Sequence, residues 1–249
     1  MIEIRGLAKR LGRRQVLDGL DLDVRKGETL VVLGPSGTGK SVLLKHIIGL
    51  MKPDAGSIRI DGEEIVGLGE RALMPVRRRF GMLFQGAALL DSMTVGENVA
   101  LAMQEHARGL GEAEVRTRVL ERLDWVGLED AVGLKPASLS GGMRKRAGLA
   151  RALAMDPEYV LYDEPTTGLD PITADVINQL IRAMQQRLHV TSVVVTHDIQ
   201  SAYAVADRIV LLYQGRVRYD GTAEETRRTD DAMMRQFIEG SSRGPIQPV

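Results

Sequence analysis

The chain of 249 residues is 44% hydrophobic and 27% charged, which is the balance of a globular protein with a sizeable buried core. Lysine plus arginine and aspartate plus glutamate number 33 each, so the composition indicates no nucleic-acid partner, and none is predicted. Cysteine does not occur, which excludes disulfides, thiolate metal sites and cysteine nucleophiles.

The first third of the chain predicts strands around one helix. Residues 2–4 and 20–24 alternate apolar and charged side chains, a pattern typical of half-buried strands. Residues 29–33 are apolar on both faces, as in a central strand. A glycine-rich turn follows, and residues 40–50 carry apolar side chains at helical spacing. Residues 57–60 predict a short strand that ends at an Asp-Gly turn.

The middle of the chain is predicted to be almost wholly helical. A strand at residues 80–84 leads into a section, about residues 86–156, in which three helical patterns follow one another. Thr94 and Glu97 have the spacing of a capping box, so the first of these helices is expected to begin there. The basic run at residues 77–79, just before this section, is interpreted as a solvated face.

Strand patterns return in the last third, at residues 159–162 and 191–196. Between them, Asp170 and Pro171 predict the start of a long helix, with proline at its favoured first position. Residues 208–219 predict a hairpin whose turn contains glycine. The tail after this hairpin is expected to hold one short helix and a mobile end.

This order of elements predicts the fold class. Strands that alternate with helices predict an α/β protein with a mainly parallel sheet covered on both faces. The antiparallel patterns at the two ends of the chain predict a smaller antiparallel β layer. The expected division is a core of residues 1–86 and 157–221, an inserted helical subdomain of residues 87–156, and a C-terminal helix and tail of residues 222–249.

A phosphate-binding loop follows the predicted central strand. The sequence fits G-x-x-x-x-G-K-[ST], in which glycines let backbone N–H groups curl around phosphate oxygens and the helix N-terminus adds its positive dipole end. Lys40 is expected to reach the β- and γ-phosphates of ATP, and the Ser41 hydroxyl to ligate Mg²⁺. A purely structural glycine turn does not explain Lys-Ser directly after the last glycine. The predicted ATP-binding residues of this loop are Gly34, Pro35, Ser36, Gly37, Thr38, Gly39, Lys40 and Ser41.

Two carboxylates end the predicted strand at residues 159–162. The carboxyl ends of the strands are where open α/β sheets bind ligands. Asp163 is expected to hold Mg²⁺, and Glu164 to polarise the attacking water as general base.

Three further features carry little weight one by one. Residues 139–143, LSGGM, open a helix, and Ser140, Gly141 and Gly142 can form an anion-binding nest, although an ordinary N-cap is the stronger interpretation of this segment alone. Gln85 follows the strand at residues 80–84. His197 follows the strand at residues 191–196, and an isolated histidine is more often structural than catalytic.

Taken together and in this order, the segments resemble the nucleotide-binding subunits of ABC transporters. The resemblance covers about residues 2–221 and implies a P-loop NTPase with a RecA-like core. It implies a head-to-tail dimer of two copies, in which each ATP lies between the phosphate loop of one copy and the LSGGM segment of the other. Ser140, Gly141 and Gly142 would then contact the opposite γ-phosphate.

The resemblance also implies roles for the remaining residues. Gln85 would sense Mg²⁺ and the attacking water, and relay to a membrane subunit. His197 would contact the γ-phosphate and orient the water, and Asp170 would communicate across the dimer. The chain departs from the family where Met143 replaces a glutamine and where Leu11 stands near the place of an adenine-stacking aromatic. Leu11 by apolar contact, or an arginine at 13 or 14 by stacking, is the expected replacement.

Within the family, LSGGM, FQGAALL at residues 84–90 and GLDPIT at residues 168–173 resemble the MlaF-type ATPases. That resemblance implies phospholipid transport between the inner and outer membranes, with an MlaE-like integral membrane permease and an Mce-domain lipid-binding protein. The apolar runs of this chain are far shorter than the roughly 20 residues that cross a bilayer, so the ATPase is expected at the cytoplasmic face of the inner membrane, held by its permease. The alternatives are a small-solute importer, a drug exporter, or a soluble ABC ATPase outside transport.

Overall fold

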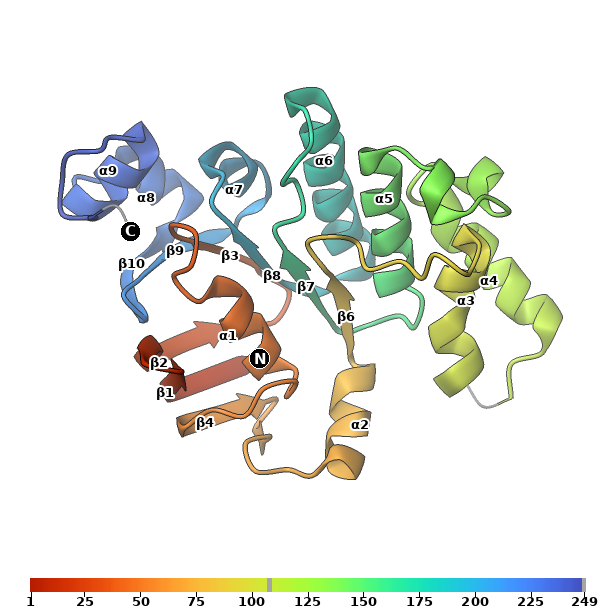
Figure 1. The fold of residues 1–249 in the computed structure, drawn as a ribbon, viewed down its shortest axis with the longest axis horizontal. Coiled ribbons are helices and arrows are strands. Elements are labelled where there is room, and N and C mark those ends of the chain that lie inside the picture. Colours follow the sequence, from red (N-terminus) through yellow and green to blue (C-terminus); the bar gives the residue numbers. More distant parts are fainter. Residues whose placement is uncertain (107–108, 248–249) are drawn as a thin grey trace. The chain divides into compact units, whose positions relative to one another are not determined.

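The computed structural model, drawn as a ribbon in Figure 1, describes residues 1–106 and 109–247. The chain forms two compact units. The first unit comprises residues 1–77 and 191–249, and the second comprises residues 78–190. All of the predicted helical subdomain belongs to the second unit, together with the strands and the helix on either side of it. The boundaries proposed for that subdomain remain a proposal. Residues 107–108 of this subdomain and 248–249 of the predicted tail lie outside the described residues.

The first unit contains a small antiparallel sheet. Its four strands are β1 (Ile2–Leu11), β2 (Arg14–Val24), β4 (Ala55–Ile60) and β5 (Glu63–Glu64), in the order β2-β1-β4-β5. The pairing of Ile2 with Val24 and of Ile4 with Leu22 places the alternating apolar side chains on one buried face, as the sequence pattern predicts.

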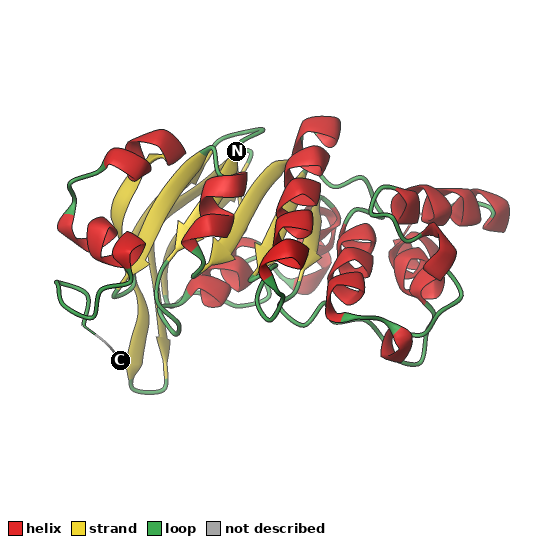
Figure 2. Cartoon of the chain, turned by 90° about the horizontal axis from the view of Figure 1, so that it is seen from above, coloured by secondary structure: helices red, strands yellow, loops and turns green. Residues whose placement is uncertain are grey.

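A second group of strands in this unit surrounds β3 (Thr29–Leu33), which is buried along its whole length. β8 (Thr191–Thr196) and β9 (Arg208–Tyr213) both pair with β3 in parallel, and β10 (Arg216–Thr222) pairs with β9 as an antiparallel hairpin. Helices α1 (Lys40–Ile47) and α7 (Ile199–Val205) pack on these strands (Figure 2). The predicted α/β class is confirmed. The C-terminal hairpin, however, is not part of the small antiparallel sheet, because β9 takes a place beside β3.

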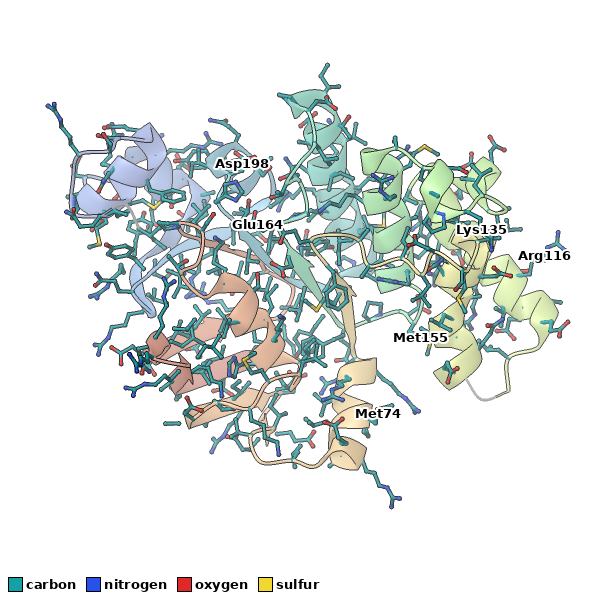
Figure 3. All side chains as sticks on the ribbon, in the orientation of Figure 1. Met74, Arg116, Lys135, Met155, Glu164 and Asp198 are labelled. Carbon is teal, nitrogen blue, oxygen red and sulfur yellow. The ribbon has the colours of Figure 1, made fainter. Side chains whose placement is uncertain are left out.

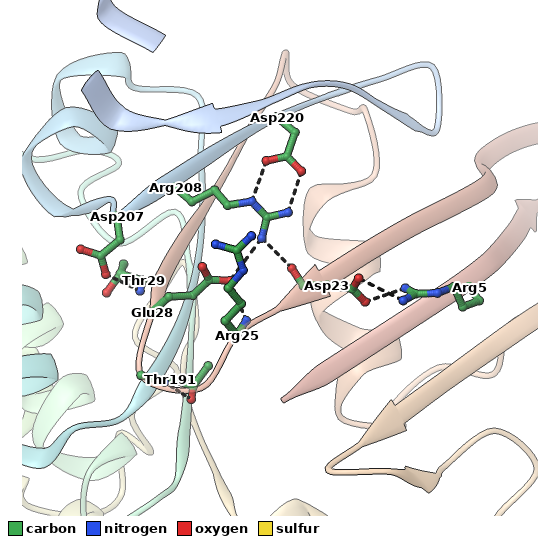
Figure 4. Close-up of polar contacts among 10 residues, drawn as sticks. Arg5, Asp23, Arg25, Glu28, Thr29, Thr191, Asp207, Arg208 and Asp220 are labelled. Atoms are coloured by element: carbon green, nitrogen blue, oxygen red, sulfur yellow. Dashed lines mark hydrogen bonds and ion pairs between the residues drawn. The ribbon is translucent and has the colours of Figure 1, made fainter. Parts of the chain in front are cut away.

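Arg208, at the start of β9, anchors this hairpin (Figure 4). Its guanidinium donates two hydrogen bonds of 2.6 Å to the carboxylate of Asp220 on β10 and a third, of 2.9 Å, to the backbone oxygen of Asp23 at the end of β2. Glu28 lies 3.3 Å from the same guanidinium. Bidentate charge-assisted pairs are both strong and directional, so this cluster holds β9 and β10 at the start of β3.

In its described residues, the second unit contains a pair of parallel strands, four α-helices and two short 3-10 helices. The strands are β6 (Phe80–Leu83) and β7 (Tyr159–Asp163), and Phe80 stacks on Tyr159 at their start. Helix α3 begins behind the predicted capping box, since Thr94 and Glu97 exchange hydrogen bonds between side chain and backbone. The helices are α3 (Val95–His106), α4 (Glu112–Asp124), α5 (Gly141–Ala152) and α6 (Pro171–Leu188).

Several sequence predictions of local structure were wrong. Helix α1 ends at Ile47 rather than at residue 50, because Gly49 takes a left-handed φ of 65° that ends the helix. The tail, as far as residue 247, holds two helices, α8 (Ala223–Arg228) and α9 (Ala232–Glu239), instead of one. Helices α7 and α2 (Glu70–Arg78) were not predicted.

The interpretation of the basic run at residues 77–79 was also wrong for two of its members. Arg77 donates to the backbone oxygens of Ile48 and Gly49, where α1 ends, at 3.1 and 2.9 Å. Arg79 forms a bidentate pair with Glu158. Of the three arginines, Arg78 is the exposed one. Cations that complete the last carbonyls of a helix stabilise its end, which the spacing of charges in the sequence does not reveal.

Hydrogen bonds hold the tail in place as far as residue 247, the last residue that the structure describes. The side chain of Gln236 on α9 exchanges hydrogen bonds with the backbone of Ile246, at 2.7 and 2.9 Å, and the backbone N–H of Gln247 donates to the Tyr213 hydroxyl at 3.1 Å. Ile246 is buried. This part of the tail is therefore ordered, contrary to the prediction of a mobile end.

Candidate active site

The phosphate loop joins β3 to α1 in the first unit. A Cβ atom at Gly34 would overlap the backbone oxygen of Leu212, and one at Gly39, whose φ is 102°, would lie 2.8 Å from Val16. Both positions therefore require glycine. Lys40, only 6% exposed, folds back over the loop and donates to the oxygens of Gly34 and Pro35 at 2.7 and 3.2 Å. The loop curls around its own lysine, as a phosphate cradle does.

The N-terminus of α1 has no side-chain cap, and its first turn has no acidic residue. Its first turn reads Lys40-Ser41-Val42-Leu43, so the positive end of the helix dipole and the lysine act in the same direction. The Thr38 hydroxyl donates to the Pro35 oxygen at 2.9 Å and tightens the loop. These residues fit the phosphates of a nucleotide, with the Ser41 hydroxyl as an oxygen ligand of the kind that Mg²⁺ prefers.

The two predicted carboxylates stand at the end of β7 in the second unit, and Figure 3 shows Glu164 there. Asp163 and Glu164 are both buried. Glu164 has a φ of 49°, a left-handed conformation that is unusual for a residue other than glycine. Its carboxylate accepts a hydrogen bond of 2.9 Å from the Thr167 hydroxyl. Strained backbone of this kind persists where surrounding contacts hold it, and such positions cluster at active sites.

Lys145 on α5 contacts the backbone next to these carboxylates. Lys145 is only 5% exposed, and its ammonium group donates to the backbone oxygens of Gln85 and of Glu164, the latter at 2.9 Å. Burial lowers the pKa of Lys145, and the carboxylates of Asp163 and Glu164 partly offset that effect. Lys145 lies near the N-terminal end of α5, where a cation opposes the helix dipole, and its position in the sequence does not reveal these contacts. The two neighbouring arginines also donate hydrogen bonds to backbone oxygens. Arg144 donates to Leu139, and Arg146 donates to Val126 and Gly127.

The LSGGM segment begins α5. The Ser140 hydroxyl accepts a hydrogen bond of 3.2 Å from the backbone N–H of Met143, so the serine is an N-cap, as the structural alternative expected. A Cβ atom at Gly142 would lie 2.5 Å from Thr173 of α6, which means that close packing of the two helices requires this glycine. A Cβ atom at Gly141 would lie 3.4 Å from the Leu169 side chain, an ordinary van der Waals contact, so packing does not require a glycine there.

Asp170 and His197 stand next to helix starts. Asp170 accepts hydrogen bonds of 3.0 Å from the backbone of Ile172 and of Thr173, which makes it the predicted N-cap of α6. The hydrogen bond from the Thr173 hydroxyl contributes most to lowering the pKa of Asp170. His197 is exposed between the end of β8 and Asp198, which caps α7 (Figure 3).

The predicted site residues divide between the two units. Residues 34–41 and His197 belong to the first unit. The second unit holds Gln85, residues 140–142, Asp163, Glu164 and Asp170. Within the second unit, Lys145 brings the backbone of Gln85 and of Glu164 to one ammonium group.

Comparison with known proteins decides the family. The sequence model of the ABC transporter family matches residues 17–167. The intermembrane phospholipid transport system ATP-binding protein MlaF of Haemophilus influenzae is 42% identical over 247 residues, which cover 99% of this chain and 93% of that protein. The chain belongs to the ABC transporter family. A probable ribonucleotide transport ATP-binding protein, mkl, of Mycobacterium leprae is also 42% identical, over 98% of this chain and 70% of its own length.

The fold of the chain is similar to that of solved ABC ATPase structures. A dimeric ATP-binding cassette in a post-hydrolysis state, bound to ADP and Pi, matches with a TM-score of 0.83 and 36% identity. The match covers 90% of this chain and 99% of that one. The phosphate loop, the acidic pair and the LSGGM segment thus lie in a P-loop ATPase fold, and the predicted class of enzyme is confirmed.

Two residues that sequence reasoning missed hold the loop after Gln85 in this ABC ATPase. The fully buried side chain of Asn98 accepts a hydrogen bond of 2.7 Å from the N–H of Leu90 and donates to the oxygens of Leu90 and Thr94 at 3.1 and 2.9 Å. Arg151 donates to the oxygens of residues 87 and 88 at 2.7 and 2.6 Å. A polar residue inside the apolar stripe of α3 was the available signal for Asn98.

A pocket of about 250 Å³ adjoins the phosphate loop in the first unit. It lies beside Gly37 and Thr38 of the loop, and Arg14 forms part of its wall. Leu11, which the sequence suggested as cover for adenine, is 44% exposed at the end of β1 and is outside this lining. The remaining lining residues come from β2, the β9–β10 hairpin and the tail: Gln15, Val16, Tyr213, Gln214, Gly215 and Gln247.

Within residues 1–106 and 109–247, every helix is too short or too polar to span a lipid bilayer.

Proposed function

We propose that this ABC ATPase energises phospholipid transport between the inner and outer membranes of a bacterium, as a head-to-tail homodimer bound to an MlaE-like permease at the cytoplasmic face of the inner membrane. An Mce-domain lipid-binding protein is the proposed third component. The observation that carries the proposal is the similarity to MlaF along nearly the whole chain. The similarity to mkl favours a second candidate, an importer of a polar solute.

Purification of the tagged protein with its membrane partner from detergent-solubilised membranes tests the cargo. Mass spectrometry of the complex is expected to identify phospholipid in excess over matched membrane extracts, and peptides of a permease. A complex that carries a polar solute, with phospholipid only at background level, would favour the second candidate.

Each of the predicted site residues has a role in the proposed chemistry. Lys40 and the loop amides bind the β- and γ-phosphates, and Ser41, Asp163 and Gln85 are the proposed Mg²⁺ ligands. The bound Mg²⁺ would offset the negative charge that develops on the phosphoryl oxygens. Glu164 accepts the proton of the attacking water as general base. His197 orients that water, and residues 140–142 of the partner copy complete the γ-phosphate site.

We further propose that the pocket beside the phosphate loop takes the adenosine part of ATP. Arg14→Ala is expected to weaken nucleotide binding about two- to fivefold, since a cation–π contact of a guanidinium with a base contributes about 0.5–1 kcal/mol at exposed sites. Titration with a fluorescent ATP analogue measures this change. Arg13→Ala is the matched control, because Arg13 is exposed one residue away and outside the pocket lining. An equal loss in both variants would contradict the assignment.

The loop at residues 87–93 is the proposed contact with the permease. Asn98 holds the backbone of Leu90, while the Leu90 side chain remains 43% exposed, so a rigid loop presents an apolar group to a partner. Leu90→Asp is expected to weaken assembly with the permease at least about tenfold, because a buried unpaired charge is costly. It should leave ATP binding and the melting temperature of the isolated subunit unchanged. A pull-down from solubilised membranes measures assembly.

Leu120→Asp is the control for that experiment, because Leu120 on α4 is 38% exposed and lies elsewhere in the second unit. If both substitutions weaken assembly equally, the contact is not specific to the loop. If Leu90→Asp lowers the melting temperature by many degrees, Leu90 contributes to folding rather than to docking.

A further inference from the structure

Lys145 joins three functional segments of the second unit through one side chain. It lies in α5, one turn after Gly142 of the LSGGM segment. Its ammonium group donates to the backbone oxygens of Gln85 and of Glu164. A lysine ammonium has three donors, so two backbone oxygens from distant parts of the chain can be bound at once.

The backbone that Lys145 contacts adopts conformations that need support. Glu164 has a φ of 49°, and Ala87 and Ala88, just beyond Gln85, have φ values of 60° and 51°. Left-handed backbone costs free energy for residues other than glycine, so contacts from outside the segment must favour it. For residues 87 and 88 that contact is Arg151, two turns further along α5 than Lys145. For Glu164 the contacts include Lys145 at its backbone oxygen and Thr167 at its carboxylate.

Helix α5 therefore supports the strained backbone at both places with its own cations. The close fit of α5 to its surroundings strengthens this link, since a Cβ atom at Gly148 would lie 2.8 Å from Leu83 and 3.1 Å from Ala87. Lys145 and Arg151 are both carried by α5, so a displacement of this helix would move both cations away from the backbone oxygens that they bind. Close packing around the helix leaves no space in which the side chains could compensate for such a displacement.

We propose that Lys145 is a positioning residue for ATP hydrolysis, which ties Gln85 and Glu164 to the helix that begins at the LSGGM segment. When residues 140–142 contact the γ-phosphate of the ATP bound by the partner copy, the position of α5 is fixed. The backbone of Gln85 and Glu164, which Lys145 binds, is then fixed as well. This inference rests on the proposed roles of Glu164 and of the LSGGM segment. Arg146 shows the structural alternative, since it also donates to two backbone oxygens, those of Val126 and Gly127, away from any predicted site residue.

Kinetics of Lys145→Met, Lys145→Arg and the control Arg146→Met, each in the full chain, test the proposal. Lys145→Met is expected to lower kcat about tenfold or more, while the Kd for a fluorescent ATP analogue changes by less than about twofold, because misplaced catalytic groups lose transition-state contacts alone. Lys145→Arg, which keeps charged donors, should recover a large part of kcat. Arg146→Met should keep kcat within about twofold of the parent, whatever it does to the melting temperature, because Arg146 binds the backbone of Val126 and Gly127 and not that of Gln85 or Glu164.

Three results would overturn the proposal. One is a kcat of Lys145→Met within twofold of the parent. Another is an equal loss of kcat in Arg146→Met. The third comes from a double-mutant cycle with Glu164→Gln, in which adding Lys145→Met should lower the residual hydrolysis by much less than it lowers that of the parent, since the base that Lys145 positions is already absent. A further loss of the full single-mutant size would mean that the two residues act independently.

Failure of the proposed function would look different. If Glu164→Gln alone hydrolyses ATP at the parent rate, the role of Glu164 is wrong, whatever Lys145→Met does. If Glu164→Gln is inactive while Lys145→Met is fully active, only the inference about Lys145 fails.

Discussion

Replacement of Glu164 by glutamine is expected to lower steady-state ATP hydrolysis at least about a hundredfold, because an amide cannot accept the proton of the attacking water. The substitution keeps the size of the side chain. The glutamine oxygen can still accept the 2.9 Å hydrogen bond that Thr167 donates to Glu164. Nucleotide binding should therefore persist, and the variant should accumulate as an ATP-bound dimer. Phosphate release and size-exclusion chromatography with and without ATP measure the two effects.

Glu158→Gln is the matched control for this experiment. Glu158 precedes β7, is exposed, and pairs with Arg79 rather than with a site residue. Loss of an exposed ion pair typically changes stability by about 0–1 kcal/mol, so this variant should hydrolyse ATP as the parent does. Near-normal turnover of Glu164→Gln would exclude Glu164 as the base. An inactive Glu158→Gln would point to general damage of the strand.

The second large effect concerns the LSGGM segment. Ser140→Arg is expected to stop hydrolysis, by about a hundredfold or more, because a long charged side chain would take the place proposed for the γ-phosphate of the partner copy. Ser140 also caps α5, and loss of an N-cap costs about 0.5–2 kcal/mol, so a modest drop in melting temperature is expected as well. ATP binding by the separate subunit should be retained, since the phosphate loop is unchanged.

Two comparisons decide the cause of that loss. Ser138→Arg adds the same charge two residues earlier, at an exposed position, and should leave turnover close to the parent value. Lys40→Ala, in contrast, should weaken nucleotide binding itself, because Lys40 belongs to the phosphate loop. Full activity of Ser140→Arg would contradict an ATP site completed by a second copy.

Contiguous residues determined those elements whose conformation depends on one short stretch of chain. The buried strands β3 and β8 have the predicted bounds, since five or six apolar and β-branched residues in a row favour one local conformation. The caps at Thr94 and Asp170 are also as predicted, because a cap needs only the residues of one turn. The phosphate loop belongs to the same class, with its glycines, lysine and serine adjacent in the chain.

Contacts between distant residues, in contrast, were decided only by the tertiary structure. The sequence of the C-terminal hairpin fits either sheet, and pairing of β9 with β3 selects one of them. The charge of Lys145 says nothing of which carbonyl oxygens it binds, and the spacing of Arg77 does not reveal that it completes the end of α1. Local sequence thus determined the chemistry of the phosphate loop, whereas the supports of Gln85 and Glu164 depend on long-range packing, in which residues far apart in the chain supply the hydrogen bonds.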